Sequence, residues 1–431
     1  MYLKSIITAA GALCLGSSLF TAQAEPFNAD DYLTGDLGGV RSQLHDKGID
    51  LQLMYIFETG TNVKGGQSEH QYSYADQTIF GVDTDLEKLF DWQGSSFHVQ
   101  FVNRGGQSDN LATKAETGQL LQSLEVYGRG RTTRISAFYY QQKLFDDKLD
   151  IKLGRMGFSS QFAAFRCEMA YLGGCSSQPG NFNSTIYNFP IAPWAAVVNY
   201  QFNDEWYLRV GAIQMNPNWL SHGQRLNFLN ASGTQGVTLP VELGWNPTIN
   251  NLPGTYKLGF WHDNVGGDDL YFNQDGQPLA LNGGEAKRNH SRNGGYFVVD
   301  QQLTTEDGSD QGLSVFSMGT FNDRDMTTVD RSLIVGLSYK GLFDGRDDDN
   351  LGVAAHYLHV SQRLADGARL QIRNGQLVDV QNDEWGVTAY YTMQVTPYFK
   401  LHPEVQFLGN PGGTSANADV WVAAIRGDLT F

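Results

Sequence analysis

Residues 420–431 alternate between apolar and polar positions. One face of this stretch is apolar and aromatic, and it consists of Trp421, Ala423, Ile425, Gly427 and Leu429. The other face carries Arg426 and Asp428. A period of two with one charged and one apolar face suits a strand that lies between lipid and water. A half-buried strand of a soluble sandwich has the same period, so the rest of the chain has to decide between the two.

The same alternation recurs along the chain and predicts about 16 strands. Their approximate ranges are 51–58, 78–86, 95–104, 134–143, 149–155, 193–200, 206–214, 236–245, 256–263, 294–302, 312–320, 332–340, 352–361, 385–394, 399–407 and 420–431. A short helix is predicted over 40–47, and a loop over 59–77. Residues 105–133 are expected to be partly helical or to extend a strand.

The connections between these strands alternate between long and short. Long loops begin near residues 59, 105, 156, 215, 264, 321, 362 and 408, and brief turns lie near 89, 144, 202, 247, 303, 341 and 395. The turns near 303 and 341 are longer than the others. All long loops then fall on one side and both ends of the chain on the other, as an even-stranded outer-membrane barrel requires.

Aromatic residues lie at or near the ends of many predicted strands. They are Tyr55, Trp92, Tyr139, Tyr140, Trp206, Tyr207, Trp261, Tyr339, Trp385, Tyr398 and Trp421. This placement favours the aromatic girdles of a membrane barrel. A closed sheet pairs every backbone N–H and C=O in lipid and leaves no edge, and about 16 strands enclose a water-filled lumen. We therefore predict an all-β, transmembrane, antiparallel up-and-down β-barrel.

The N-terminal residues have the pattern of an export signal. Lys4 precedes an apolar run, residues 6–20, and Ala22-Gln23-Ala24 forms a small-x-small cleavage site. We predict a signal peptide over 1–24, a periplasmic segment over 25–50 and the barrel over 51–431. No later segment approaches 18 consecutive apolar residues, which excludes helical membrane spans.

Composition and charge agree with this interpretation. The chain has 49 Gly, 20 Tyr, 25 Phe and 8 Trp, as expected of a β protein. Its mean hydropathy of −0.34 does not oppose a membrane protein, because every second residue of a porin strand faces water. The net charge of −16 argues against nucleic-acid binding.

Two cysteines, Cys167 and Cys175, remain after the predicted cleavage. In an oxidising compartment a local disulfide is the favoured interpretation. A metal site would require nearby histidines or further cysteines, and residues 166–179 contain none.

Several short stretches resemble one known family. They are residues 33–41 (LTGDLGGVR), 126–130 (VYGRG), 152–156 (KLGRM), 162–181 with both cysteines, 403–406 (PEVQ) and 410–413 (NPGG). In this order they resemble the OprB-type carbohydrate-selective porins of Gram-negative bacteria. The resemblance extends over essentially the whole mature chain.

The resemblance implies a barrel in the bacterial outer membrane that passes sugars, glucose among them, by facilitated diffusion. It also implies a constriction lined by arginines, acids and aromatics. Carried onto this chain, these are Arg104, the cluster Arg129, Arg131 and Arg134 as guanidinium donors, and Trp194 as an aromatic platform. Expected partners are small sugars, outer-membrane lipid and lipopolysaccharide, and the barrel-assembly machinery, which would recognise the last strand ending in Phe431.

Strand alternation gives an independent test of which residues face the lumen. Arg104 shares a face with His98 and Gln100, and Arg209 lies between two apolar neighbours, so both are expected to point inward. The same test selects Glu242, Asp263 and Glu404. Arg155 fails it, because it is in phase with apolar residues. Arg426 and Asp428 are interpreted as wall charges outside the constriction.

A sugar-selective wall requires fixed donors beside acceptors, and Arg with carboxylates or amides supplies both. Arginines suit a small organic acid equally well, so a porin for another small solute is an alternative. A secreted soluble carbohydrate-binding β protein is a third. The sequence contains neither a Gly-x-Ser-x-Gly elbow nor a His-Glu-x-x-His pair, so we expect neither an enzyme nor a cofactor.

Overall fold

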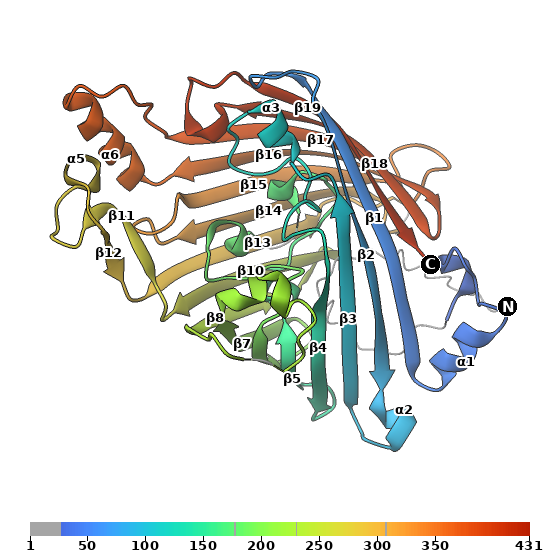
Figure 1. The fold of residues 1–431 in the computed structure, drawn as a ribbon. Coiled ribbons are helices and arrows are strands. Elements are labelled where there is room, and N and C mark those ends of the chain that lie inside the picture. Colours follow the sequence, from blue (N-terminus) through green and yellow to red (C-terminus); the bar gives the residue numbers. More distant parts are fainter. Residues whose placement is uncertain (1–26, 176–177, 230, 307) are drawn as a thin grey trace.

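The computed structural model describes residues 27–175, 178–229, 231–306 and 308–431. Sixteen long strands and the two-residue strand β9 form one antiparallel sheet (Figure 1). The long strands are β1(Ile49–Lys64), β2(Tyr72–Asp85), β3(Ser95–Gly106), β4(Thr133–Leu144), β5(Leu149–Met156), β6(Trp194–Gln201), β7(Trp206–Met215), β8(Gly236–Trp245), β10(Leu252–Asp263), β13(Arg292–Gln302), β14(Gly312–Asn322), β15(Val329–Lys340), β16(Asn350–Val360), β17(Asp383–Thr396), β18(Phe399–Gly409) and β19(Val420–Thr430).

The sheet closes on itself. Each long strand pairs with the next one along the chain, and β1 pairs with both β2 and β19. In the closing pair Tyr55 lies opposite Leu429, and Thr59 lies opposite Ile425. No long strand is left with an unpaired edge, which removes the template for edge-to-edge aggregation. The predicted up-and-down barrel is confirmed.

All the predicted strands are present, and their bounds differ by a few residues. The largest error concerns the predicted loop over 59–77, which is wrong in extent because β1 continues to Lys64 and β2 begins at Tyr72. The polar residues in this stretch belong to strand ends. Asn62, for example, faces inward, where its side chain bonds to the main chain of Gly65, Ser68 and Gln71. Polarity at a strand end therefore did not signal a loop.

The remaining elements are short and lie in the connections. They are η1(Ala29–Asp31), α1(Val40–Asp46), α2(Leu86–Phe90), α3(Leu111–Ala115), η2(Phe158–Ser160), η3(Leu172–Gly174), α4(Pro179–Phe182), η4(Pro217–Leu220), η5(His222–Gln224), β9(Thr248–Ile249), β11(Gly267–Asn273), α5(Leu279–Asn282), β12(Ala286–Asn289), α6(Gln362–Arg373) and η6(Pro411–Gly413). The helix predicted over 40–47 corresponds to α1. The β11–β12 hairpin and α6 were not predicted, and they stand at the long-loop end (Figure 1).

Burial alternates along the strands as a barrel wall requires. In β15 the outward residues Leu333, Val335 and Leu337 are exposed, whereas Ile334 and Ser338 between and beyond them are buried. An apolar outer face of this kind suits contact with lipid acyl chains. Among the described residues, no helix combines the length and the hydropathy that crossing a bilayer requires.

The segment before β1 is fastened to the closing strands. The Arg41 guanidinium, on α1, donates to the main-chain oxygens of Leu51 at 2.9 Å and of Phe431 at 2.8 Å. Leu33 N–H donates to the Thr430 oxygen at 2.9 Å. Residues 33–41 therefore act as a latch across the seam between β1 and β19. The predicted signal peptide, 1–24, lies outside the described residues.

Within this latch, Asp36 holds the first turn of α1. The main-chain N–H and the hydroxyl of Ser42 each donate to its carboxylate at 2.7 Å. These bonds to the charged form lower the pKa of Asp36 below its ordinary value.

Candidate functional site

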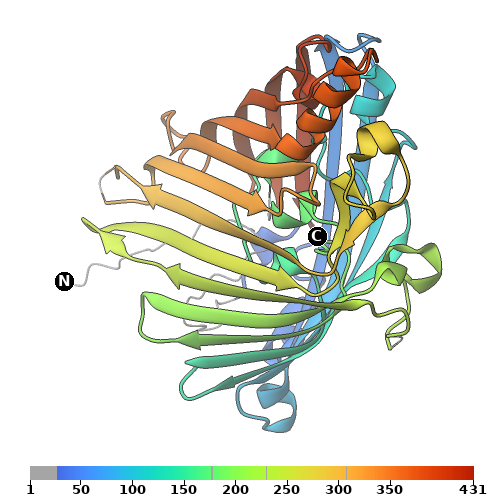
Figure 2. The ribbon, with the colours of Figure 1, turned by 90° about the vertical axis from the view of Figure 1, so that its left-hand side faces the viewer.

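Two connections from the long-loop end fold into the barrel. They are loop 107–132, between β3 and β4, and loop 157–193, between β5 and β6. In Figure 2 the green segment that follows β5 lies inside the ring of strands. Apolar side chains of this segment, such as Phe162 and Met169, have no exposed surface and pack against inward residues of the wall. The loops therefore narrow the lumen.

Loop 157–193 follows the inner wall from β7 to β18. Its contacts, in chain order, are the Gln161 oxygen with Arg209 of β7, Ala163 N–H with Glu242 of β8, the Ala164 oxygen with Lys257 of β10, Arg166 with Asp300 of β13, Glu168 with Tyr390 of β17, and Ala170 N–H with Glu404 of β18. The loop is therefore held by polar bonds along its whole inward path.

Loop 107–132 contacts the wall from β17 through the closing strands β19 and β1 to β3. Its contacts are Leu120 N–H with Glu384 of β17, the Ser123 oxygen with Gln406 of β18, Glu125 with Arg426 of β19, Val126 N–H with Glu58 of β1, and the Gly128 oxygen with Arg104 of β3. The two loops also meet directly, because Leu172 N–H donates to the Gln122 oxygen at 3.0 Å.

Four glutamates of the wall hold these loops by their main chain. Glu58, Glu242, Glu384 and Glu404 each accept a loop N–H at 2.7–2.9 Å. Their exposed fractions are 0%, 0%, 0% and 4%. A buried carboxylate is costly unless it is paired, and a backbone N–H aimed at it is a strong, charge-assisted partner. The four residues are therefore anchors for the loops.

This placement changes the interpretation of three predicted residues. Glu242 and Glu404 point inward as alternation required, but they lie beneath loop 157–193 and contact its main chain. Asp263 is also fully buried, where it accepts from the Thr185 hydroxyl at 2.7 Å and from Val265 and Gly266 N–H groups. The sequence placed Glu58 on the polar face of its strand without assigning a role, and Glu384 was not selected.

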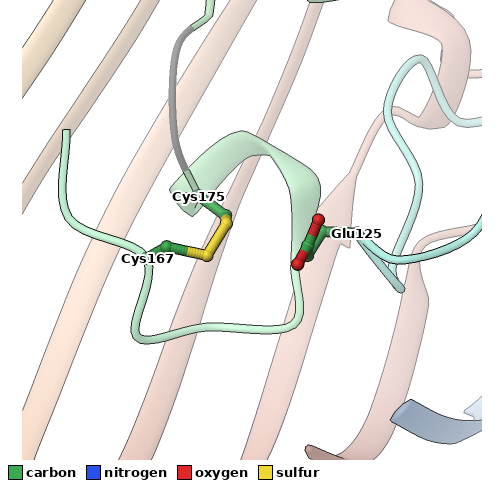
Figure 3. A group of neighbouring side chains, drawn as sticks. All are labelled: Glu125, Cys167 and Cys175. Carbon is green, nitrogen blue, oxygen red and sulfur yellow. A yellow bond between two sulfur atoms is a disulfide. The ribbon is translucent and has the colours of Figure 1, made fainter. Parts of the chain in front are cut away.

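The disulfide lies where the two loops approach each other. Cys167 and Cys175 are joined, as predicted, and Glu125 of loop 107–132 faces them (Figure 3). Among the described residues these three form the only group of potential metal ligands, with ligand atoms within 4.8 Å of one another. Both sulfurs belong to the disulfide, so the group lacks the thiolates that a metal site of this kind uses.

Arg426 connects this junction to the barrel wall. Its guanidinium lies 2.9 Å from Glu125, 2.9 Å from Asp428 and 3.4 Å from Glu58, and it donates to Cys167 Sγ at 3.4 Å. Arg426 and Asp428 belong to the wall strand β19, as expected, and the contacts of Arg426 with both loops add to that expectation. Arg426 is the centre of an ion network that joins the wall to both loops.

A second ion cluster centres on Arg166, which sequence reasoning did not select. Its guanidinium forks onto both oxygens of Asp300 at 2.7 Å and donates to the Ser338 hydroxyl at 2.7 Å. Glu168 lies 3.6 Å away, and the guanidinium stacks 4.3 Å from the Phe316 ring. The side chains of Asp300 and Glu168 keep 33% and 26% of their surface exposed, so they present acceptors to the lumen.

The predicted arginines occupy three different settings. Arg104 faces inward, is 6% exposed, and donates to Gln77 at 3.0 Å and to the Gly128 oxygen. Arg209 is buried beneath loop 157–193, where it donates to Gln161 and lies 3.6 Å from Glu242. Arg134 is buried and donates to the main chain of residues 129 and 219. Arg129 and Arg131 lie exposed in loop 107–132.

Trp194 and Arg155 lie on the outward phase of the wall. The inward residues of β6 are Ala195, Val197 and Asn199, so Trp194 falls on the opposite face. It packs with Trp219, and the Arg155 guanidinium stacks 4.0 Å from the same ring. This position gives no support to Trp194 as a platform for solute in the lumen. Arg155, which fails the alternation test, lies in phase with the outward residues of β5.

The fold and the lumen define a porin-type channel of the bacterial outer membrane, with an aqueous passage narrowed by loops and lined by paired charges. The family model described as "Carbohydrate-selective porin, OprB family" matches residues 69–431. Porin B of Pseudomonas aeruginosa is 35% identical over 98% of this chain and 96% of its own length. The chain belongs to the OprB family of carbohydrate-selective porins.

Solved structures agree. The high-pH structure of Pseudomonas putida OprB is 34% identical and has a TM-score of 0.90, over 94% of this chain and 99% of that chain. The outer-membrane channel DcaP of Acinetobacter baumannii has a TM-score of 0.51 at 9% identity, over 89% of this chain and 97% of that chain, and shares the fold alone. Family and barrel are those of channels rather than enzymes.

Proposed function

We propose that this porin conducts glucose and other small neutral sugars into the periplasm by facilitated diffusion. The observation that carries the proposal is the pairing of charges in the narrowed lumen. Arg166 is paired with Asp300 and Glu168, and Arg426 with three carboxylates. Guanidinium donors beside carboxylate acceptors match sugar hydroxyls, which both donate and accept.

In this proposal the solute passes beside the junction of the two loops. Asp300, Glu168 and Glu125 supply partly exposed acceptors, and Arg166 supplies a donor held in place by its own partners. Several shallow contacts allow release, which a conducting pore requires. Arg104 and the exposed Arg129 and Arg131, which the sequence predicts as guanidinium donors of the constriction, act at the entrance in this proposal. Arg209, Glu242, Asp263 and Glu404 act indirectly, by holding the loop.

The test is conductance of the purified protein in planar bilayers, with glucose and other sugars titrated in. We expect concentration-dependent block by sugars, weakened in Arg166→Ala and in Arg104→Ala. Arg324→Ala is the matched control, because this arginine lies in the connection between β14 and β15, is 71% exposed, and forms its ion pair with the neighbouring Asp325. A large open pore that is indifferent to every sugar would contradict the proposal.

A small organic acid is the second candidate, and one observation favours it. Among the ion pairs of the described residues, none includes Arg104, Arg129 or Arg134, which lie together at the entrance. Guanidinium groups without carboxylate partners attract anions. Block by acetate or benzoate that exceeds block by glucose, together with anion selectivity, would select this function.

We also propose that the last strand, with Phe431 at its end, is recognised by the barrel-assembly machinery. The support is that β19 is the strand that closes the barrel, and that its outward face is apolar and aromatic. We expect Phe431→Ala to lower the yield of folded porin in outer-membrane fractions. An unchanged yield would contradict this proposal.

A further inference from the structure

The described residues of the connection between β7 and β8 are 216–229 and 231–235. Trp219 packs against Tyr187 and Ile191 of loop 157–193, whereas residues 222–229 lie against the outer wall of β3, β4 and β5. The Phe228 ring packs 5.1 Å from Phe138 and 6.1 Å from Phe101, both on outward positions. The Arg225 oxygen accepts from Ile135 N–H at 2.9 Å. We call residues 222–229 the outer strap.

The outer strap presents apolar side chains where a barrel meets lipid. Leu226 and Leu229 are 49% and 74% exposed, on either side of Phe228. An open hollow of about 620 Å³ is lined by residues 222, 223 and 225–229. Exposed leucines beside a hollow are costly in water and are satisfied by acyl chains.

Positive charge borders the same hollow. Arg225 is half-buried and donates to the His222 oxygen, and no ion pair among the described residues includes it. The His222 ring lies 3.4 Å from the place of a Cβ on Gly130, which brings Arg129 and Arg131 to the border of the strap. Among the ion pairs of the described residues, none includes Arg129, Arg131 or His222 either.

The strap belongs to the end of the barrel that carries the long loops, which in an outer-membrane barrel is the extracellular end. The outer leaflet there holds glycolipids whose headgroups carry phosphates next to acyl chains. Basic pockets beside apolar surface are the general form of a lipid-headgroup site. The geometry points to a binding site for the phosphorylated glycolipid of the outer leaflet, that is, lipopolysaccharide.

In this site the phosphate lies on Arg225 and His222, with Arg131 at the edge, and an acyl chain lies on Leu226, Phe228 and Leu229. The site differs from the lumen in both location and ligand, so it does not depend on which solute the pore carries. A guanidinium is well suited to phosphate, because it presents planar paired donors.

The test measures binding of bisphosphorylated lipid A to the full-length porin in detergent, by native mass spectrometry. Dephosphorylated lipid A and inorganic phosphate are the comparison ligands. We expect Arg225→Gln to weaken lipid A binding about fivefold, the effect of one cation near a lipid phosphate. Arg288→Gln is the matched control, an exposed arginine of the same end that pairs with Asp268.

A second variant separates lipid from a soluble anion. Leu226→Asn combined with Leu229→Asn should weaken lipid A binding and leave binding of inorganic phosphate unchanged. Equal affinity for phosphorylated and dephosphorylated lipid A, or an unchanged affinity in both variants, would overturn the proposal. Loss in Arg225→Gln with no loss in the leucine variant would also overturn it, in favour of a soluble anion. Heat-modifiable gel migration of each variant verifies folding.

Discussion

Each of the four buried glutamates anchors a segment of an in-folded loop to the barrel wall. Each one faces a lumen that would otherwise solvate it, and each instead accepts a backbone N–H from an in-folded loop. Without the loop N–H, the buried carboxylate would lack a hydrogen-bond donor. Without the carboxylate, the buried loop N–H would lack an acceptor. The width of the passage therefore depends on groups that do not contact the solute.

Glu404 allows a direct test of this role, because its partner is the N–H of Ala170 in the middle of loop 157–193. We expect Glu404→Ala to destabilise the loop by about 1.5–3 kcal/mol, the contribution of a hydrogen bond to a charged group. Open-channel noise and conductance should rise. Glu404→Gln keeps an acceptor oxygen and should restore most of the wild-type trace. Identical traces from the two variants would refute the anchor role.

The stability of the latch formed by residues 33–41 should depend on pH through a single residue, Asp36. The pKa of Asp36 is lower in the folded protein than in the unfolded chain, because the N–H and hydroxyl of Ser42 donate to its carboxylate. The stability that these bonds add to the latch is therefore complete above the unfolded pKa and is lost as pH falls through the folded pKa. We expect the protection of the α1 amides, measured relative to exchange in the unfolded chain, to be lost in acid below the ordinary aspartate pKa of 3.8. Asp36→Asn should show low protection at every pH. A profile unaffected by this substitution would contradict the assignment.

At the scale of elements, the disulfide fixes the part of loop 157–193 that meets loop 107–132. Cys167 and Cys175 are eight residues apart, and the segment between them carries Ala170 and Tyr171. Tyr171 stacks on His356 of β16 at 4.3 Å, so this short cycle is tied to the far wall as well. The cross-link therefore restricts where Cys167 and its neighbours can lie relative to Glu125 and Arg426.

Replacing both cysteines with serine tests this restraint. A disulfide that closes a short loop contributes on the order of 2–3 kcal/mol. We expect Cys167→Ser with Cys175→Ser to keep the barrel intact, as heat-modifiable migration reports, but to broaden the conductance distribution and weaken sugar block. Serine at one position alone should broaden it to the same extent. Unaltered block in the double variant would show that wall contacts suffice to hold the loop.

At the scale of the whole molecule, the wall was predictable and the lumen was not. Period-two alternation is a local property, so it located every long strand and placed Arg104 on the inward face. The anchors depend on contacts between distant residues: Ala170 and Glu404 are 234 positions apart. Alternation showed that Glu242 faces inward, yet it could not show that a loop covers it. The error at Trp194 was avoidable from the sequence, because Trp194 is an odd number of positions from Val197 and Asn199 and therefore lies on the opposite, outward face of its strand.

The latch across the seam has a consequence for chain connectivity. Leu33 and Thr430 are hydrogen-bonded neighbours, and Arg41 reaches the last residue, so the two termini of the folded barrel lie side by side. A short linker between them would leave the order of strands around the ring unchanged. New termini can then be opened in the long extracellular connections, for instance after α6. The fold should therefore tolerate circular permutation, with the first strand of the chain chosen at any of several positions around the ring.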